Sequence, residues 1–446
     1  MMHAYPKELA SFVTRQWDTP CSVLDRTELD VLEPDLGDDL PDTSTLEHLI
    51  STCYQASLLR DEERPVRFRL ILRHPDTFAP DQGPPRGLHR LVFTEPRQCT
   101  DHELGRLAPS AGFYDSLIGV MQDGGGELTI WGLLHSGPRW VQTLYGGGKA
   151  FQPLPPALVI HVTSPGRITV CKGSVTIATL NAGHIHCPSI DVFDANWLKM
   201  IFKDARDRAY SLHLAAREQA GKPWAHVDED LLRTIKKQVM MRVISKMRTF
   251  HHGGTLICIP EARVAEFESE NPCVQLKYRF APGEPRRRFQ SILVRLANSL
   301  AESYGPRGQQ DRTVGWREYL ASKDKELSRA DEAIFEWAHL VAGLSSVDGA
   351  VVLTRSYELL GFGGEISGKL DAVDTVAKAL DPEAQRTLAQ RTTRVGTRHH
   401  SVYRICNVLH DVMGMVVSKD GTVQIVKWRE GAVTCWDQVA TSVMDV

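Results

Sequence analysis

The chain has 446 residues, of which 42% are hydrophobic and 24% charged, and its formal net charge is −3 at pH 7. This length exceeds one ordinary hydrophobic core, so we expect two or three domains. The small net charge excludes a global basic field that would attract nucleic acid or an anionic membrane, and any site for a polyanion must be local.

Nothing in the sequence indicates export or membrane insertion. The first residues, MMHAYPKELASFVTRQW, lack the basic region and the continuous apolar stretch of a signal peptide. No run approaches the roughly 20 apolar residues that a membrane helix needs. The nine cysteines are scattered, without C-x-x-C, which is typical of free thiols in a reducing compartment. We therefore expect a cytoplasmic protein.

The first half of the chain is rich in strand signals. In RPVRFRLILR, apolar residues alternate with Arg67, Arg69 and Arg73, which predicts a half-buried strand with a basic outer face. Further strands are predicted at 88–93, 127–135 and 139–145. Residues 157–183 predict a three-stranded meander that turns at Pro165-Gly166 and Lys172-Gly173.

Helical patterns around 195–219 complete this half, and Gly221-Lys222-Pro223 marks a plausible boundary. We therefore expect an α+β, β-rich regulatory domain over 1–225.

The second half alternates helix and strand. Helices are predicted at 229–248, 286–300, 328–343 and from about 401 to 413, and strands at 253–260, 350–354, 358–363 and in a terminal hairpin. The run Arg286-Arg287-Arg288 is interpreted as a solvated helix start. This alternation predicts an α/β domain over 226–446, with a mixed central sheet flanked by helices.

Asp348 lies in SVDGAVVL, between a helix end and a strand start. An Asp-Gly pair at such a place is more often only a turn. Alternatively, the carboxylate is a ligand for Mg²⁺ or Mn²⁺ beside a hydroxyl that loses its proton, and Gly349 lets a nucleoside approach the backbone.

The segment GTRHHS, from Gly396 to Ser401, carries a second candidate site. Thr397 can donate to a phosphate oxygen, Arg398 offers a bidentate fork, and the following helix points its free N–H groups to the same place. The alternative, an exposed basic helix start, is equally compatible with these residues.

Asp420, in VVSKDGT, is by default a turn former, and it is a second metal ligand only if Asp348 is the first. Two other patterns carry less weight. Gly146-Gly147-Gly148-Lys149 lacks the remaining positions of a phosphate-binding loop. His184-Ile185-His186-Cys187 has no partner pair at zinc-site spacing, which favours a structural strand.

Taken together, three ordered segments resemble the diadenylate cyclase (DAC) family: Asp348-Gly349-Ala350, then Gly396-Thr397-Arg398-His399, then Val417-Ser418-Lys419-Asp420. That family carries D-G-A, G-T-R-H-R and V-S-E-E in this order. The first half resembles the DACNV sensor domain found ahead of such cyclases, in segments that include CYQASLLRDEERPVRF, IWGLLHSGPRW and PPALVIHVTSPGRITV.

The resemblance implies an α/β DAC domain that condenses two ATP into cyclic di-AMP with release of two pyrophosphates. It implies that Asp348 binds Mg²⁺ or Mn²⁺ and helps to activate the 3′-hydroxyl, with Asp420 as second ligand. The resemblance gives catalytic roles to Asp348, Arg398 and His399. The substrate-binding set it implies is Gly349, Ala350, Gly396, Thr397, Arg398, His399, His400, Ser401 and Ser418.

The family's domain holds one ATP, so the resemblance also implies a homodimer, or a higher homo-oligomer, for catalysis. Two departures stand out: His400 replaces the usual Arg, which removes a permanent charge and a fork, and Lys419-Asp420 replaces two acidic residues. They leave two alternatives open, a catalytically weak nucleotide-binding signalling module and a cyclase that makes another cyclic dinucleotide.

Overall fold

The computed structural model describes residues 3–18, 40–84, 87–113, 115–137, 154–173, 175–186, 192–250, 252–269, 271–305, 312–393, 395–419 and 421–437. These residues form two compact units, one ending at 186 and the other beginning at 192. The predicted strand at 139–145, the glycine run 146–148 and Asp420 lie outside the described residues. Within the described part, no helix is long and apolar enough to cross a membrane.

The first unit is built on an eight-stranded sheet with the strand order β10-β9-β8-β7-β3-β5-β6-β4. Only the β3–β5 pair is parallel in this sheet. The strands are β3 (Phe68–Leu72), β4 (His89–Gln98), β5 (Ser116–Gln122), β6 (Leu128–His135), β7 (Leu158–Ser164), β8 (Arg167–Lys172), β9 (Val175–Asn181) and β10 (His184–His186). A separate small hairpin joins β1 (Arg60–Asp61) to β2 (Arg64–Pro65).

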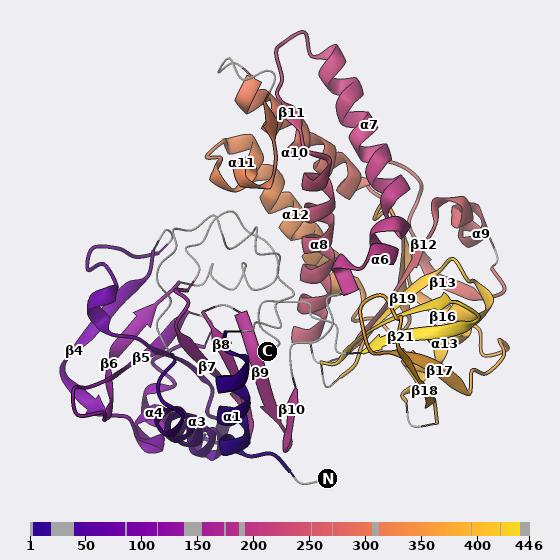
Figure 1. Cartoon of the computed structure of the whole chain (residues 1–446). Coiled ribbons are helices and arrows are strands. Elements are labelled where there is room, and N and C mark those ends of the chain that lie inside the picture. Colours follow the sequence, from indigo (N-terminus) through magenta and orange to yellow (C-terminus); the bar gives the residue numbers. More distant parts are fainter. Residues whose placement is uncertain are drawn as a thin grey trace. The chain divides into compact units, whose positions relative to one another are not determined.

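Three helices cover one face of this sheet: α1 (Pro6–Gln16), α3 (Thr43–Leu58) and α4 (Asp101–Leu107) (Figure 1). Apolar side chains from β3, β7 and β8 meet them there, among them Leu70, Ile160 and Val170. The predicted meander is confirmed, and Gly166 takes the positive φ of +69° that its turn requires. The β-rich character of the first half agrees with the prediction.

The second unit holds a nine-stranded mixed sheet with the order β13-β16-β15-β12-β19-β20-β21-β17-β18. The strands are β12 (Gly254–Ile259), β13 (Val274–Arg279), β15 (Ala350–Thr354), β16 (Leu359–Ile366), β17 (Thr375–Ala379), β18 (Thr387–Arg391), β19 (Met413–Val417), β20 (Val423–Arg429) and β21 (Ala432–Asp437). Strand β12 runs parallel to β15 and antiparallel to β19. The predicted mixed sheet is confirmed.

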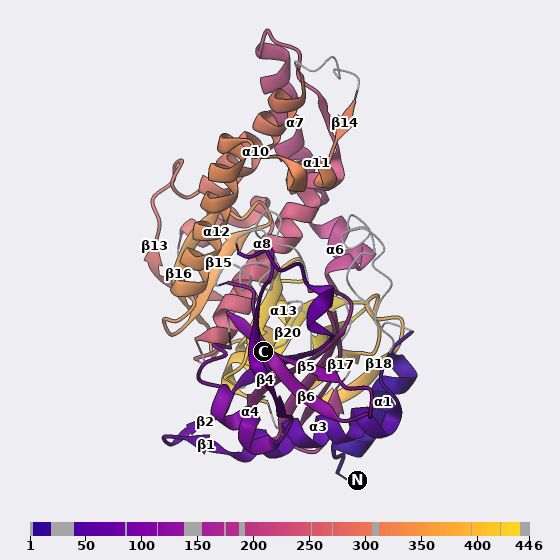
Figure 2. The ribbon, with the colours of Figure 1, turned by 90° about the vertical axis from the view of Figure 1, so that its left-hand side faces the viewer.

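Helices pack on both faces of the second sheet. The sides of β12 alternate, with Leu256 and Cys258 in one apolar cluster and Ile257 and Ile259 in the other. The first cluster includes α8 (Glu229–Thr249), α10 (Arg288–Tyr304) and α12 (Lys325–Leu344), which lie side by side in Figure 2. The second includes α13 (Thr397–Val408). Shorter elements complete the unit: α6 (Asn196–Ile201), β11 (His226–Val227), α9 (Val264–Glu268), β14 (Thr313–Val314) and α11 (Trp316–Ala321).

The second unit begins upstream of the predicted boundary at residue 225. Helix α7 (Lys203–Gln219) packs against α8 and α10, and His213 on α7 forms a 2.7 Å hydrogen bond with Asn298 on α10. Trp197 on α6 stacks on Trp436 of β21, with ring centroids 4.4 Å apart. These contacts group 192–225 with the α/β unit, because the apolar sides of both helices are buried there.

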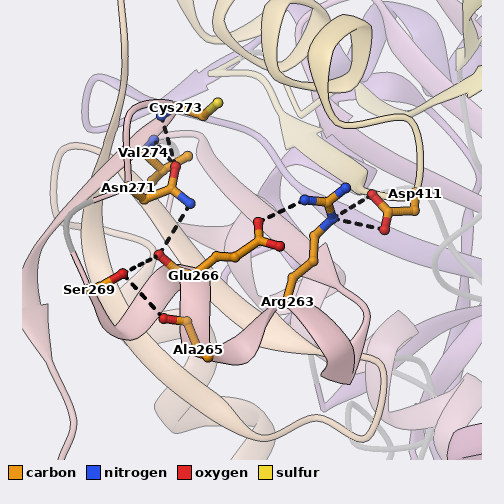
Figure 3. A network of polar contacts seen from close by, with 8 residues as sticks. All are labelled: Arg263, Ala265, Glu266, Ser269, Asn271, Cys273, Val274 and Asp411. Atoms are coloured by element: carbon orange, nitrogen blue, oxygen red, sulfur yellow. Dashed lines mark hydrogen bonds and ion pairs between the residues drawn. The ribbon is translucent and has the colours of Figure 1, made fainter.

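One edge of the second sheet is held by a polar network (Figure 3). Arg263, which follows β12, donates from Nε to both carboxylate oxygens of Asp411, at 2.7 and 2.8 Å, and Asp411 precedes β19. Asn271 accepts from the backbone N–H groups of Cys273 and Val274 and so starts β13. Because β12 and β19 are antiparallel, this network lies at the edge opposite Gly254 and Val417.

Candidate active site at one edge of the second sheet

The three predicted segments meet at the edge of the sheet where β12 begins. Register pairs Thr255 of β12 with Ala350 and Gly254 with Val417. The residues before β15, Asp348 and Gly349, therefore lie on one side of Gly253, and Ser418 lies on the other. Segments that are far apart in the sequence are thus gathered by the order β15-β12-β19.

Gly253 is the point of closest approach. Its φ is +67°, and a Cβ built there would lie 2.6 Å from the carbonyl oxygen of Val417 and 3.2 Å from Nη1 of Arg398. A side chain at this position would displace both, so only glycine fits. Arg398 consequently rests against the backbone at the junction of β12 and β19.

Arg398 also faces Asp348. Its Nη2 lies 3.9 Å from Oδ1 of Asp348, and the side chains are 36% and 99% exposed. An ion pair this long and this exposed contributes little stability. Both groups remain accessible to a ligand, with a guanidinium and a carboxylate on the same side of the sheet edge.

The Asp-Gly-Ala turn is shaped by close backbone packing. Gly349 has a φ of +110°, and a Cβ there would lie 2.6 Å from the carbonyl carbon of Gly363 in β16. The side chain of Ala350 is buried in the apolar cluster that includes α13. Ala350 therefore anchors the turn in the core, and the groups that a ligand can reach from this segment are Asp348 and the backbone of Gly349.

Helix α13 begins four residues earlier than its apolar pattern predicted. Gly396 is its N-cap, with extended φ and ψ of −72° and 164°, and Thr397 is its first residue. His400 donates its backbone N–H to the carbonyl oxygen of Gly396, at 3.2 Å. The backbone N–H groups at the start of a helix point away from the helix along its axis, and Thr397 and Arg398 are the first two residues here. Because the helix starts at Thr397, the whole Thr-Arg-His segment lies in its first turn, and Ser401 follows in the second.

A buried polar layer lies beneath the two histidines. The rings of His399 and His400 are 6.3 and 6.5 Å from the ring of Tyr403. The Tyr403 hydroxyl donates to Oε1 of Gln424 at 2.9 Å, and Gln424 Nε2 donates to Asp437. Burial raises the pKa of Tyr403 above its usual range, so this hydroxyl stays protonated and fixes the network. The sequence patterns did not indicate Tyr403 or Gln424.

Two further basic residues border the site. The guanidinium of Arg248, near the end of α8, has Nε 3.6 Å from a Cβ built on Gly421, in the turn after Ser418. Lys277 of β13 pairs with Glu365 at 2.6 Å, which is the main cause of its raised pKa, and Asp348 adds a smaller contribution. No motif pointed to either residue. Arg248 lies only five positions before Gly253, the sole sequence signal for it.

A divalent cation fits the described residues only in part. Asp348 offers one exposed carboxylate, and Mg²⁺ is commonly held by one or two carboxylates together with substrate phosphates. Among the described residues, no group of three or more His, Cys, Asp or Glu side chains could hold a metal ion by itself. The other predicted ligand, Asp420, lies outside the described residues.

Part of the first unit is similar to a described protein family. Residues 36–135 match the family described as a probable sensor domain DACNV. This match covers α3 and the strands β3 to β6 of the first sheet. No curated protein matches the chain. The comparisons thus show that residues 36–135 are similar to a probable sensor domain, and the site in the second unit rests on its own geometry.

Proposed function

We propose that this protein is a metal-dependent diadenylate cyclase, a cytoplasmic nucleotidyltransferase whose first unit regulates the second. The observation that carries the proposal is the convergence of Asp348-Gly349, the start of α13 and Ser418 around Gly253. The match of residues 36–135 to a DACNV sensor domain supports it, because such domains are associated with diadenylate cyclases.

The arrangement suits phosphoryl transfer, which requires positioning and charge neutralisation more than covalent chemistry. We assign the triphosphate to the backbone N–H groups of Thr397, Arg398 and His399, in the first turn of α13, and to the Arg398 guanidinium. Arg248 and Lys419 add positive charge near the same turn. His400 and Ser401, the next two residues of α13, border this proposed site.

We assign to Asp348 the activation of the nucleophile, which is the 3′-hydroxyl of ATP. In each half-reaction the 3′-oxygen of one ATP bonds to the α-phosphorus of the other, the bond to the β-phosphate breaks, and pyrophosphate leaves. The 3′-hydroxyl gives up its proton, and the exposed carboxylate of Asp348 is the acceptor that we assign to it. Mg²⁺ or Mn²⁺, held by Asp348 and, we propose, Asp420, would supply charge neutralisation at the phosphates.

Two half-reactions are needed for a cyclic product. Each chain has one such site, at the sheet edge of its second unit. We therefore propose that two chains meet face to face in a homodimer of two-fold symmetry. The geometry of a single site then serves twice, with each ATP acting once as nucleophile and once as electrophile.

The test is incubation of the full chain with ATP and Mg²⁺ or Mn²⁺, with products identified by mass spectrometry. We expect cyclic di-AMP and pyrophosphate from the native chain, and loss of at least about 100-fold in rate for Asp348→Asn. Asp204→Asn, an exposed aspartate in the first turn of α7, is the matched control and should keep full activity.

The outcomes separate the alternatives. Full activity in Asp348→Asn would remove the proposed mechanism. ATP binding without any product would favour the catalytically weak signalling module. A product of different mass made from other nucleotides would identify a cyclase of another specificity.

A further inference from the structure

A row of polar side chains crosses the sheet of the first unit from β3 to β9. Arg69 of β3 is the direct register partner of His161 in β7, His161 of Thr169 in β8, and Thr169 of Thr179 in β9. Direct cross-strand partners point to the same face of a sheet. We call these four residues the polar row. They alternate with Leu70, Ile160 and Val170, so they lie on the face opposite α1, α3 and α4.

The polar row is buried, although the sequence predicted Arg69 on a basic outer face. Arg69 is 0% and His161 1% exposed, and Thr169 and Thr179 are buried as well. One step along the strands on the same face, Ile71, Val159 and Cys171 belong to an apolar cluster. A polar layer therefore begins abruptly inside a buried face where a simple core would continue with apolar side chains.

His161 and Thr163 are the residues that a core does not explain. Both ring nitrogens of His161 and the hydroxyl of Thr163, two positions further along β7, are buried without a hydrogen-bond partner among the described residues. A buried polar group without a partner is destabilising, and folded proteins rarely leave one unpaired. Three unpaired polar atoms on one strand indicate that something else supplies their partners.

The charges around the row select the kind of partner. The Arg69 guanidinium donates from Nη2 to Ser136 Oγ at 3.2 Å, and the Arg67 guanidinium lies 4.9 Å from the centre of the Phe113 ring, which in turn contacts the His161 ring edge-on. Asp115 is a nearby carboxylate that partly offsets Arg69. Burial, with the charge of Arg69, lowers the pKa of His161, so its imidazole is neutral and offers one donor and one acceptor. A cation is disfavoured beside a buried guanidinium, whereas an oxyanion is favoured.

We propose that the polar row, with Thr163, is a ligand-binding site of the first unit that takes a small molecule through a phosphate or carboxylate group. Arg69 supplies the positive charge, and His161 and Thr163 supply hydrogen bonds to the ligand. This site lies in the unit whose residues 36–135 match a probable sensor domain. It is independent of the proposed cyclase chemistry, because none of its residues belongs to the second unit.

The test uses the full chain carrying Arg398→Ala, so that the proposed triphosphate site does not itself capture the probe. Inorganic phosphate and succinate are titrated separately, with sodium chloride at matched ionic strength as the reference, and binding is followed by scanning and titration calorimetry. We expect one of the two anions to raise the unfolding temperature of the first unit and to bind one per chain. Which of the two acts distinguishes a phosphate-bearing from a carboxylate-bearing ligand.

Variants separate specific binding from the general stabilisation that such salts give. In His161→Phe and, separately, Thr163→Val, the affinity should fall at least about tenfold, as expected for a lost hydrogen bond to a charged group. The matched control is His213→Phe, a buried histidine of the second unit, which should leave the affinity unchanged. If neither anion binds, or if His161→Phe and Thr163→Val both bind as tightly as the parent, the proposal is overturned.

Discussion

At the scale of single residues, His400 is one of the positions where the site departs from the resembled family. It occupies the first turn of α13, and its ring is 6.5 Å from that of Tyr403. We expect His400→Arg to lower the KM for ATP about tenfold with little change in kcat, because a permanent guanidinium adds a charge-assisted contact to the triphosphate. Initial rates across ATP concentrations measure this.

The control for His400→Arg adds the same charge elsewhere. His48 is an exposed residue of α3, and His48→Arg should leave KM unchanged. An unchanged or raised KM in His400→Arg would show that this position does not face the triphosphate.

Lys236 gives the second unit a stability that depends on pH. It is buried, its Nζ donates to the carbonyl oxygen of Arg355 at 3.0 Å, and burial lowers its pKa from 10.5 to about 8. Between these values the unfolded chain binds the proton and the folded chain does not. Stability contributed by this group therefore rises as pH increases from 8 to 10.5, by up to about 3 kcal/mol.

The expected result is a difference between two urea titrations. The native chain should gain stability across this pH window relative to Lys236→Met, which has no titrating group there. Lys325→Met, at an exposed position on α12, is the control that should keep the native slope. Parallel stability curves for the native chain and Lys236→Met would contradict the assignment.

At the scale of elements, the position of α13 depends on Gly414 in β19. A Cβ built there would lie 2.2 Å from Cγ1 of Val402, so glycine lets the helix approach the sheet. We expect Gly414→Ala to destabilise the second unit by about 1–3 kcal/mol and to reduce cyclase activity, because overpacking shifts the helix that carries Arg398. Denaturant unfolding and product formation measure the two effects.

A double-mutant cycle identifies the cause. Val402→Ala alone leaves a cavity and costs about 2 kcal/mol or more. If the clash is the mechanism, Gly414→Ala combined with Val402→Ala is more stable than the sum of the single effects predicts. Strict additivity would mean that α13 is not positioned by this contact.

The elements also show which features the sequence predicts and which it does not. Apolar periodicity placed β3, β7, β8, α8 and α10 well, because these segments bury one regular face. Strand β18 was not predicted, since its side chains are largely exposed at the end of the sheet. The early start of α13 was missed because Gly396, its N-cap, carries no side chain that signals a cap.

Buried charged residues caused the main errors in the predictions from sequence. Arg286 was interpreted as a solvated helix start, but its side chain is 4% exposed and pairs with Glu268 and Glu358, both at 2.7 Å. Those carboxylates are 18 and 72 residues away in the sequence, so no local pattern contains them. Arg69 was misplaced for a similar reason, because alternation shows which residues share a face and not whether that face is covered.

For the candidate site, the motifs predicted the residues of the three segments but not the neighbouring residues that contact them. Asp348, Arg398 and Ser418 lie at one sheet edge, as their shared resemblance implies. Tyr403, Gln424 and Arg248 come from positions without a motif. Tyr403 lies on α13 one turn after the two histidines, whereas the fold of the sheet brings Gln424 of β20 to it. The roles of all these residues stay predictions until product formation is measured.

At the scale of the whole molecule, the proposed synthesis of cyclic di-AMP would require two chains, because each proposed site activates only the 3′-hydroxyl of its own ATP. The rate per chain should therefore fall on dilution to concentrations at which sedimentation shows monomers. Monomers that retain the full rate would contradict the dimer.

Mixing native and variant chains tests whether each Asp348 serves one of the two half-reactions. A dimer of one native chain and one Asp348→Asn chain can form one of the two phosphodiester bonds but not the second. With Asp348→Asn in excess, cyclic di-AMP should decrease and a linear dinucleotide that retains one triphosphate should accumulate, together with one pyrophosphate per molecule. Mass spectrometry separates the two products. If the mixture makes only the cyclic product in proportion to the native chain, and no linear dinucleotide, the proposal that each Asp348 serves one half-reaction is wrong.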